Sequence, residues 1–289
     1  MAILVNGASS VLIQGITGKQ GSFHFRQMRA FGTNIVAGVA PGKGGSRFED
    51  IPLYETVQEA CEHHTIDATV LFIPAAFCKD AALEAIEAGI KVIVIITEHI
   101  PVQDELIIVN RAKLKEAVII GPNTFGMASW KCKLGILPNV AFSPGPVGVV
   151  ARSGTLTYEI VGSLTNVGIG QTSVIGLGGD RVPGSSFVDM LKRFEVDPDT
   201  KCVVLVGEIG GNAEEEAAEF IKTMSKPVVA YLAGKSAPPG KRMGHAGAII
   251  ERGKGTYEGK VKALTAAGAQ VATFPYEVVE KVQTLLGHA

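Results

Sequence analysis

The chain has 289 residues, which is enough for about two domains of ordinary size, and its hydrophobic fraction of 46% can supply a large core. Its formal net charge of −1 argues against nucleic acid as the main partner, because nucleic-acid binding needs clustered positive charge. The sequence has no basic leader and no apolar run of about 18 residues or more, so we expect no targeting segment and no membrane partner.

The cysteines are scattered along the chain without the spacing of a metal site. We therefore expect free thiols, no bound metal and a cytoplasmic location. A protein of the mitochondrial matrix whose transit peptide had been removed would show the same features. The four cysteines are Cys61, Cys78, Cys132 and Cys202.

Strands and helices alternate through the first half of the chain. Because this alternation favours a parallel sheet, we predict an α/β, Rossmann-like, doubly wound domain in residues 1–123. The low aromatic fraction of 6% and the 35 glycines also suit the tight turns of an α/β fold. The predicted strands are 11–14, 35–39, 68–73, 92–96 and 118–120, and the predicted helices are 24–31, 57–63, 79–88 and 103–115.

A glycine-rich loop at residues 15–21 follows the first predicted strand. Its spacing is GxxGxxG, and Lys43 follows the second strand, where a nicotinamide-binding unit has an acidic residue for the ribose hydroxyls. Because a cation in a glycine loop suits phosphate, we expect a nucleotide with a phosphorylated ribose, such as coenzyme A or NADP. An ordinary surface lysine is the alternative. Residues 73–76 and 96–98 end strands at the same edge, where open α/β folds bind ligands.

The alternation stops between residues 121 and 146, in a stretch that contains several prolines and glycines and the only tryptophan. We interpret this stretch as the crossing between domains, with the first domain ending at residue 123 and the second in residues 124–289. The second half then repeats the α/β pattern. Its predicted strands are 147–151, 172–176, 202–206, 228–232 and 270–273, and its predicted helices are 156–166, 186–194, 212–224, 256–267 and 277–285.

Three strand-end loops of the second half, residues 152–155, 207–211 and 234–247, are expected to converge at one edge of its sheet. They supply a helix start, the carboxylate of Glu208 and the imidazole of His245. A carboxylate bonded to one ring nitrogen would leave the other free to attack a phosphoryl group, and a helix start would stabilise the resulting phosphate. The sequence therefore indicates a phosphohistidine at His245. The alternative is a structural histidine whose ring nitrogens are hydrogen-bonded within a glycine-rich turn.

Motifs along the chain carry a resemblance to a known family. In order, from Gly15 to Ile250, they read GITGKQG, APGKGG, ITE, IGPN, RSGTLTYE, GEIGG and GKRMGHAGAII. The chain resembles the α subunits of succinate–CoA ligase (succinyl-CoA synthetase) over essentially its whole length.

The resemblance implies an N-terminal Rossmann-like CoA-binding domain and a C-terminal flavodoxin-like ligase domain. It also implies a partner, an ATP-grasp β subunit in an αβ or α₂β₂ assembly, that binds ATP or GTP and Mg²⁺. The phosphoryl group would pass from the nucleotide to the histidine and then to a carboxylate, and coenzyme A would displace it from the acyl phosphate.

The resemblance further assigns roles to individual residues. His245 would carry the phosphoryl group, and Glu208 would orient the imidazole ring of His245. Ser153 and Gly154 would bind the phosphate on the phosphorylated histidine, and Tyr158 would contact the substrate. Coenzyme A would be bound by residues of the first domain, namely Thr17, Gly18, Lys19, Gln20, Lys43, Ile96, Thr97 and Glu98.

The chain departs from the succinate pattern at Thr124 and Phe125 (GPNTFG for GPNCPG), at Arg181 (GGDR for GGDP) and at His99 (TEHIP for TEGIP). Thr124 and Arg181 resemble citrate-activating relatives, and an added cation suits a more highly charged acid. A citryl-CoA or malyl-CoA synthetase small subunit, acting on a dicarboxylate or tricarboxylate, is therefore the alternative to succinate. Outside this family, the alternatives are a non-enzymatic CoA-binding regulator and an NADP-dependent dehydrogenase.

Overall fold

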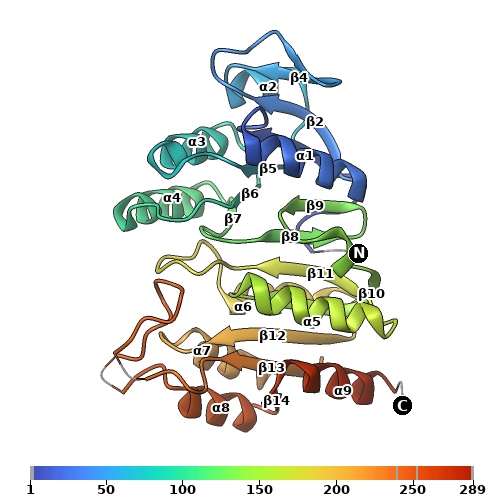
Figure 1. Ribbon diagram of the computed structural model, residues 1–289, viewed down its shortest axis with the longest axis vertical. Helices are drawn as coiled ribbons and strands as arrows, with labels where there is room; N and C mark the ends of the chain where they lie inside the picture. The colour runs from blue at the N-terminus through green and yellow to red at the C-terminus, as the bar shows by residue number, and fades with distance from the viewer. Residues whose placement is uncertain (1–2, 239, 252, 288–289) are drawn as a thin grey trace. The chain divides into compact units, whose positions relative to one another are not determined.

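The computed structural model describes residues 3–238, 240–251 and 253–287. These residues form two compact units, and Figure 1 shows alternating strands and helices in each. The N-terminal unit comprises Leu4–Asn139 and Val182–Gly184. The C-terminal unit comprises Ile3, Val140–Arg181 and the described residues from Ser185 onward.

The sheet of the N-terminal unit has the strand order β3-β4-β2-β1-β5-β6-β7, in which β3 is antiparallel to β4 and the other pairs are parallel. If the parallel strands are counted in chain order, the arrangement is 3-2-1-4-5-6, which is that of dinucleotide-binding folds. The Rossmann-like fold is confirmed. The elements are β1 (Ser10–Gln14), α1 (Lys19–Phe31), β2 (Asn34–Val39), β3 (Arg47–Phe48), β4 (Ile51–Tyr54), α2 (Val57–His63), β5 (Ala68–Leu71), α3 (Ala75–Glu87), β6 (Val92–Ile95), α4 (Val102–Leu114) and β7 (Val118–Ile120).

The core of this unit forms where α2, α3 and α4 pack on the sheet. Leu12, Leu71 and Ile93 contribute from the strands, and Ala82 and Ile108 from the helices, all at 1% exposure or less. The sequences of such strands are apolar at successive positions, because helices cover both faces of a parallel sheet. This explains why the strands could be located from the sequence.

Helix α1 begins at Lys19, earlier than the predicted start at residue 24. Gly18 is the N-cap of this helix, and Gly21 lies in its first turn. Only glycine fits at position 21, because a Cβ there would approach the Gly15 carbonyl oxygen to 2.1 Å. The glycines that suggested a longer loop therefore allow the helix to pack tightly against the end of β1. Lys19 and Gln20 are the first residues of a helix and not part of a free loop.

The strands of the C-terminal unit lie in the order β14-β13-β12-β10-β11, and the paired neighbours run parallel. Counted in chain order and from the other edge, this is the arrangement 2-1-3-4-5 of flavodoxin-like folds, as expected. The elements are β10 (Pro144–Ala151), α5 (Gly154–Asn166), β11 (Gln171–Gly176), α6 (Phe187–Val196), β12 (Cys202–Glu208), α7 (Ala213–Ile221), β13 (Val228–Ala233), α8 (Tyr257–Ala266), β14 (Gln270–Ala272) and α9 (Pro275–Leu286).

An antiparallel hairpin occupies part of the stretch that was interpreted as a domain crossing. Strands β8 (Gly126–Ser129) and β9 (Cys132–Gly135) belong to the N-terminal unit, and the division between the units falls after Asn139, within the 3-10 helix η1 (Asn139–Ala141). The expected boundary at residue 123 therefore lies inside the N-terminal unit. Gly126 permits the pairing, because a Cβ there would approach the Leu134 carbonyl oxygen to 1.9 Å.

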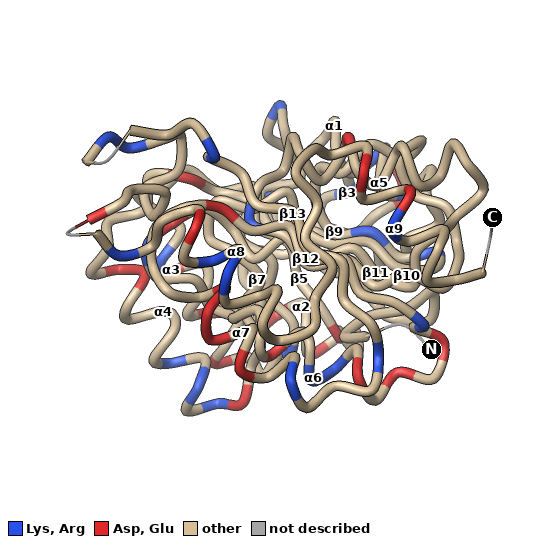
Figure 2. The backbone as a smooth tube through the Cα atoms, turned by 90° about the horizontal axis from the view of Figure 1, so that it is seen from below, with Lys and Arg blue, Asp and Glu red and all other residues tan. Residues whose placement is uncertain are grey.

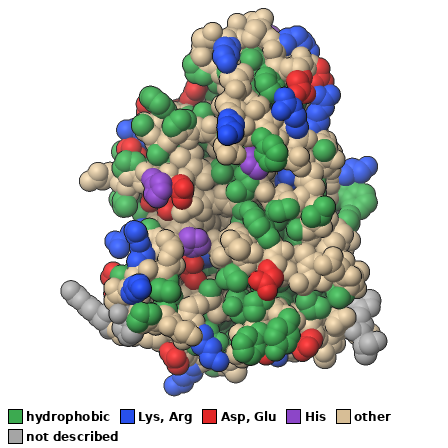
Figure 3. Space-filling view, in the orientation of Figure 1, with side chains coloured by type: hydrophobic (Ala, Val, Ile, Leu, Met, Phe, Trp, Pro, Cys, Tyr) green, Lys and Arg blue, Asp and Glu red, His purple; other side chains and the backbone are tan. Residues whose placement is uncertain are grey.

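Charged residues of both signs are interspersed along the backbone in Figure 2, and Figure 3 shows apolar and charged side chains mixed over the visible face. No helix within the described ranges has the length and apolar character needed to cross a bilayer. Nor does that part of the chain contain a group of three or more His, Cys, Asp or Glu side chains that could hold a metal ion.

Candidate active site at the carboxyl edge of the second sheet

The site is formed where the strand order of the C-terminal unit reverses. The chain leaves β10 for β11 on one side, whereas β12 lies on the other side of β10, so the loops after β10 and β12 diverge and leave a crevice. Arg152 and Ser153 follow β10, and Glu208 is the last residue of β12. The loop that follows β13 (the His245 loop) brings His245 to the same place.

The structure brings His245 and Glu208 into direct contact. His245 Nδ1 lies 2.7 Å from Glu208 Oε2, and the two side chains are 26% and 6% exposed. A carboxylate accepts a hydrogen bond, so Nδ1 carries the hydrogen. In the neutral imidazole, Nε2 then has a free lone pair. The imidazole is thus held in the tautomer that a nucleophile at Nε2 requires.

Gly179, in the loop after β11, supports one face of the imidazole ring. A Cβ at this position would lie 2.4 Å from His245 Cγ, so only glycine leaves room for the ring in this orientation. The Gly179 carbonyl also accepts a hydrogen bond from the Gly247 amide at 3.4 Å. The loop after β11 and the His245 loop, which are distant in sequence, therefore jointly fix the position of the imidazole ring.

Arg152 holds the other side of the carboxylate. It is 8% exposed, its Nε lies 3.5 Å from Glu208 Oε1, and the guanidinium donates to the carbonyl oxygens of Gly178 and Asp180 at 3.3 and 3.1 Å. A buried guanidinium that meets several acceptors fixes the loops on which they lie. Arg152 thus connects the ends of β10, β11 and β12.

The pKa of His245 is raised above its ordinary value. The hydrogen bond to Glu208 is the largest cause, burial opposes it, and the negative charge of Glu208 adds to it. The charge of Arg152 lowers the pKa and that of Asp180 raises it. The imidazolium form is therefore favoured relative to a histidine in water, and the neutral ring predominates only above this raised pKa.

A titration of the histidine ring signals by NMR checks this direction. We expect His245 to titrate above the pKa of an unperturbed histidine, about 6.5, and Glu208→Gln to lower its midpoint. Because the folded pKa is raised, the ion pair stabilises the fold fully below the unfolded pKa, and that stabilisation is lost as pH rises through the folded pKa. A midpoint at or below the ordinary value in the unmodified protein would contradict the geometry.

Gly154 and Tyr158 lie on α5, and Ser153 immediately precedes this helix, next to Arg152. Ser153 is the N-cap of this helix, and its side chain makes no capping hydrogen bond, so the first-turn amides keep their capacity to bind an anion. Among the described residues, no hydrogen bond joins the Ser153 side chain to His245. Burial raises the pKa of Tyr158 to about 12, so its phenol stays neutral.

The residues expected to bind coenzyme A lie at the carboxyl edge of the N-terminal sheet. Thr17 and Gly18 form the turn between β1 and α1, and Thr97 follows β6, where its hydroxyl donates to the Ile73 carbonyl at 2.6 Å. The Thr97 hydroxyl therefore joins the loops after β5 and β6. The remaining members at this edge are Lys19, Gln20, Lys43, Ile96 and Glu98, and the side chains of Lys19, Gln20, Lys43 and Glu98 are exposed.

Glu55 organises the Lys43 turn and was not identified from the sequence. Its carboxylate accepts from the amides of Gly42 and Gly44 at 2.7 and 2.5 Å, and these hydrogen bonds lower its pKa. The two glycines that flank Lys43 could have indicated a nearby carboxylate, because successive free backbone amides form a concave site that binds an anion. The turn presents the Lys43 side chain to solvent.

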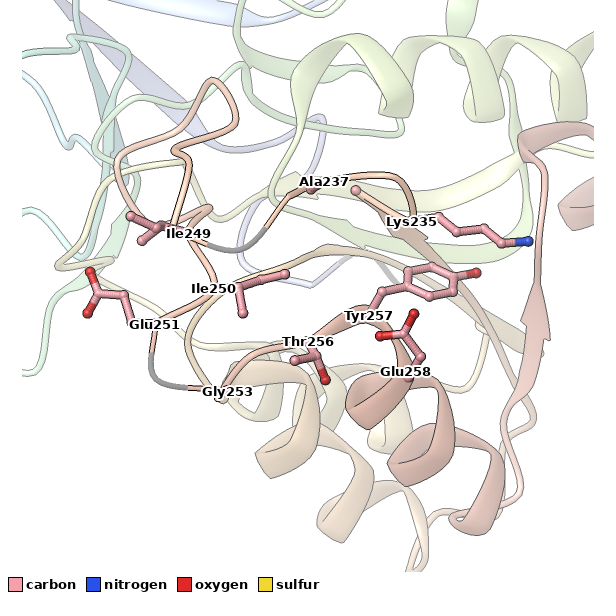
Figure 4. Close-up of a pocket in the computed structure, with 11 residues that line it drawn as sticks. Lys235, Ala237, Ile249, Ile250, Glu251, Gly253, Thr256, Tyr257 and Glu258 are labelled. Atoms are coloured by element: carbon pink, nitrogen blue, oxygen red, sulfur yellow. The ribbon is translucent and has the colours of Figure 1, made fainter.

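Two cavities flank the His245 loop. One, of about 680 Å³, has Arg152, Arg181 and Lys254 in its walls together with Glu251, so its charge suits an anion. The other, of about 850 Å³, lies between Tyr257 and Glu258 and the end of the loop, and Figure 4 shows Lys235 beside these two residues. Neither His245 nor Glu208 lines either cavity; the first contains Arg152, which contacts Glu208, whereas the second contains none of these three residues, so we assign no chemistry to the second.

The departures from the succinate pattern occupy different environments. Thr124 and Phe125 are buried at 6% and 3% exposure, and the Thr124 hydroxyl accepts from the Gly126 amide at 3.0 Å, so both belong to the packing before β8. The His99 side chain is 84% exposed. Arg181 donates to the Ala246 carbonyl at 3.3 Å and lines the smaller cavity. Arg181 therefore lies beside the His245 loop.

Comparison with known proteins places this geometry in a family. The family model of the CoA binding domain matches residues 6–99, and that of CoA-ligase matches residues 150–270. The ADP-forming succinate–CoA ligase subunit alpha 2 of Archaeoglobus fulgidus is 58% identical over 287 residues, covering 99% of this chain and 100% of that protein. The α subunit of the same enzyme from Methanothermobacter thermautotrophicus is 53% identical over 286 residues, covering 99% and 97%.

Solved structures share the fold at lower identity. An ATP citrate lyase of Methanosaeta concilii in complex with (3S)-citryl-CoA aligns with a TM-score of 0.87 at 24% identity and covers 98% of this chain, which spans about half (51%) of that longer chain. An acetyl-coenzyme A synthetase 1 of Ca. Korarchaeum cryptofilum aligns with a TM-score of 0.79 at 20% identity, covering 96% of this chain and 61% of that one. These likenesses show the fold, whereas the curated relatives show that the chain belongs to the family of succinate–CoA ligase α subunits.

Proposed function

We propose that this chain is the α subunit of an ADP-forming succinate–CoA ligase and that His245 carries the phosphoryl group through the reaction. The observation that carries the proposal is the 2.7 Å hydrogen bond between His245 Nδ1 and Glu208 at the switch point of the C-terminal sheet. It leaves Nε2 as the nucleophilic atom. The activity for which the similar proteins are named supports succinate as the acid.

In the first step, His245 Nε2 attacks the γ-phosphorus of ATP, the bond to the bridging oxygen breaks, and ADP leaves. Positive charge develops on the ring as the N–P bond forms, and the carboxylate of Glu208 at Nδ1 stabilises it. Arg152 holds that carboxylate in place from its other oxygen. The free amides of Ser153 and Gly154 at the start of α5 are suited to the phosphoryl oxygens.

In the second step, a carboxylate oxygen of succinate attacks the phosphorus and the N–P bond breaks, which restores the neutral imidazole and gives succinyl phosphate. In the third step, the thiolate of coenzyme A attacks the acyl carbon and phosphate leaves. Tyr158 is suited to contact the acid, because its neutral hydroxyl can donate a hydrogen bond to a carboxylate.

Coenzyme A is proposed to bind at the edge of the N-terminal sheet. The start of α1, with Gly18 as N-cap and Lys19 in the first turn, suits a pyrophosphate, and Lys43 suits the phosphate on the ribose. Thr97 and Glu98 offer a hydroxyl and a carboxylate from the next loop. The match of the CoA binding domain to residues 6–99 supports this assignment.

Lys43→Ala should weaken coenzyme A binding by about tenfold and leave binding of dephospho-CoA nearly unchanged. The reason is that one charge-assisted contact to phosphate contributes about 1.5 kcal/mol and is absent from the dephosphorylated ligand. Isothermal titration with both ligands, with Lys91→Ala as an exposed-lysine control, measures the difference. Equal losses of affinity for coenzyme A and for dephospho-CoA would show that Lys43 does not contact the ribose phosphate.

The catalytic assembly is proposed to include a β subunit of ATP-grasp type that binds ATP and Mg²⁺. The subunit designation of the relatives supports a partner. This chain would contribute the phosphoryl carrier and coenzyme A binding, in an αβ or α₂β₂ complex. Its four cysteines are free thiols, which supports the expected cytoplasmic location.

The acid is tested by measuring coenzyme A-dependent release of ADP from the assembled complex with succinate, malate and citrate in parallel. We expect succinate to be used best. Citrate or malate preferred over succinate would establish the citryl-CoA or malyl-CoA alternative, for which the cation at Arg181 is the supporting observation. No turnover with any acid, together with tight coenzyme A binding, would favour a non-enzymatic regulator.

Gly179→Ala should slow phosphorylation of His245 by about 10- to 100-fold, because the new Cβ would displace a ring held 2.4 Å away. Gly162→Ala is the matched control, since a Cβ in that part of α5 meets no atom within 4 Å and alanine favours a helix. Rapid-quench phosphorylation measures the rates. A rate unchanged in Gly179→Ala would show that the ring works in another orientation.

A further inference from the structure

We propose that the buried pair Glu214–Lys260 positions the carboxylate of Glu208 and, through it, the imidazole of His245. The inference rests on the phosphohistidine function proposed above. It gives a role to two residues that touch neither the substrate nor the imidazole in that proposal.

The end of β12 explains why a positioning residue is needed. Pairing of β12 with β10 ends at Val206, which faces Ala151, and the Arg152 amide donates to the Val206 carbonyl at 3.0 Å. The Ile209 amide donates to Ala233 of β13, so the preceding amide, that of Glu208, points to the opposite side, where β10 has already ended. A buried amide in that position requires an acceptor from another element.

Glu214 supplies this acceptor. It lies in the first turn of α7, is 0% exposed, and its Oε1 accepts from the Glu208 amide at 3.1 Å. Gly207 makes the approach possible, because a Cβ there would lie 2.6 Å from Glu214 Oε1. The carboxylate of Glu214 thus takes the place of the missing strand at the residue that carries the catalytic carboxylate.

Lys260 fixes Glu214 in turn. It is 0% exposed, its Nζ is paired with Glu214 Oε2, and the same atom lies 3.2 Å from Glu215 Oε2. A buried ion pair contributes little net stability, because the loss of hydration offsets the attraction. Its geometry, however, is specific, since both oxygens of Glu214 are occupied by donors from different elements. The pair therefore links α8 and α7 to the end of β12.

The consequence for the site is geometric. The Glu208 backbone is held by Glu214, and the Glu208 side chain holds His245 at 2.7 Å and Arg152 at 3.5 Å. A shift of the end of β12 would lengthen the bond to the ring and release its tautomer. Displacement of a reacting group by about 1 Å commonly costs about 100-fold in rate. Glu214 and Lys260 are thus positioning residues for the nucleophile.

Two double variants separate positioning from simple stability. Glu214→Gln with Lys260→Met removes both charges and keeps an oxygen for the Glu208 amide. Glu214→Leu with Lys260→Met removes the charges and the oxygen together. Glu219→Leu with Lys222→Met is the matched control, because it removes an exposed ion pair from α7. All are assembled with the β subunit before measurement.

We expect the Gln–Met variant and the control to phosphorylate His245 at nearly the normal rate, and the Leu–Met variant to be slower by about 10- to 100-fold. In the Leu–Met variant alone, the NMR titration midpoint of His245 should also move down toward that of an unperturbed histidine. A merely structural pair would change thermal stability without moving this midpoint, which otherwise depends on Glu208, Arg152 and Asp180.

Equal rates in the two double variants, or a slow Leu–Met variant with an unchanged His245 midpoint, would overturn the positioning role. If the Leu–Met variant does not assemble, Gly207→Ala serves instead, because its Cβ would push Glu214 away with all charges retained. Failure of the proposed function gives a different result. In that case the unmodified complex acquires no phosphoryl group, while the His245 midpoint still responds to the Leu–Met change.

Discussion

His245→Asn should lower the rate of succinyl-CoA formation by on the order of 10⁴-fold or more. An asparagine amide has nearly the polarity of the imidazole but no nucleophilic nitrogen, so the phosphoryl carrier is removed while the loop is retained. The ring is 26% exposed and contributes little to the core, so folding should be preserved. Initial rates of ADP release that depend on both succinate and coenzyme A measure the loss.

The control for this experiment is His63→Asn, which replaces an exposed histidine at the end of α2. It should leave turnover unchanged. Coenzyme A binding by His245→Asn should also remain normal, since its proposed site is in the N-terminal unit. Substantial turnover by His245→Asn would mean that the phosphoryl group passes directly between the other reactants.

Glu208→Gln should slow phosphorylation by about 100- to 1,000-fold. The amide can still contact the ring, but it lacks the charge that stabilises the developing imidazolium, and it offers Nδ1 a donor as readily as an acceptor. The loss should be larger at the chemical step than in ATP binding, because Glu208 is 5% exposed and contacts His245 and Arg152 rather than solvent. Single-turnover quench experiments separate the two.

The same variant should be less stable, because Arg152 keeps its buried charge after its carboxylate is removed. A buried charge left unpaired costs about 3 kcal/mol, although the two carbonyl bonds of Arg152 reduce this. Thermal unfolding measures the cost. Glu219→Gln, an exposed carboxylate on α7, is the matched control and should behave as the unmodified protein. A Glu208→Gln protein with normal single-turnover rates would show that the hydrogen bond has no part in catalysis.

The fold could be predicted largely from the sequence because strands of parallel sheets are buried on both faces. Runs such as residues 92–95 and 202–206 are apolar at every position and are entirely buried. Their alternation with amphipathic helices then favoured two doubly wound units. The short strands β3 and β4 were not found, since Arg47 and Pro52 interrupt the apolar pattern.

The hairpin β8–β9 was missed for a related reason. Its glycines were taken as signs of a linker, whereas Gly126 and Gly135 allow two backbones to approach closely at positive φ. Glycine indicates either a flexible segment or a tight contact, and the sequence alone does not separate the two. The close approach became visible only in the structure, where Gly135 lies opposite Gly126.

At the site, the proximity of His245 and Glu208 could be predicted, because Glu208 ends one strand and His245 follows another at the same edge of the sheet. The groups around them could not be predicted. The ion pair of Arg152, the ring support at Gly179 and the Glu214–Lys260 pair depend on side-chain directions and on the helices α7 and α8 packing together. Glu214 in particular belongs to an acidic run at a helix start, where side chains are usually solvated, yet it is fully buried.

The most direct test is to incubate the assembled α and β subunits with ATP labelled at the γ-phosphate and to locate the label by peptide mapping. We expect an acid-labile, base-stable phosphoryl group on His245 that is discharged by succinate with coenzyme A and is absent from His245→Asn. Label at another residue, or label that persists in His245→Asn, would contradict the claim that this imidazole carries the phosphoryl group.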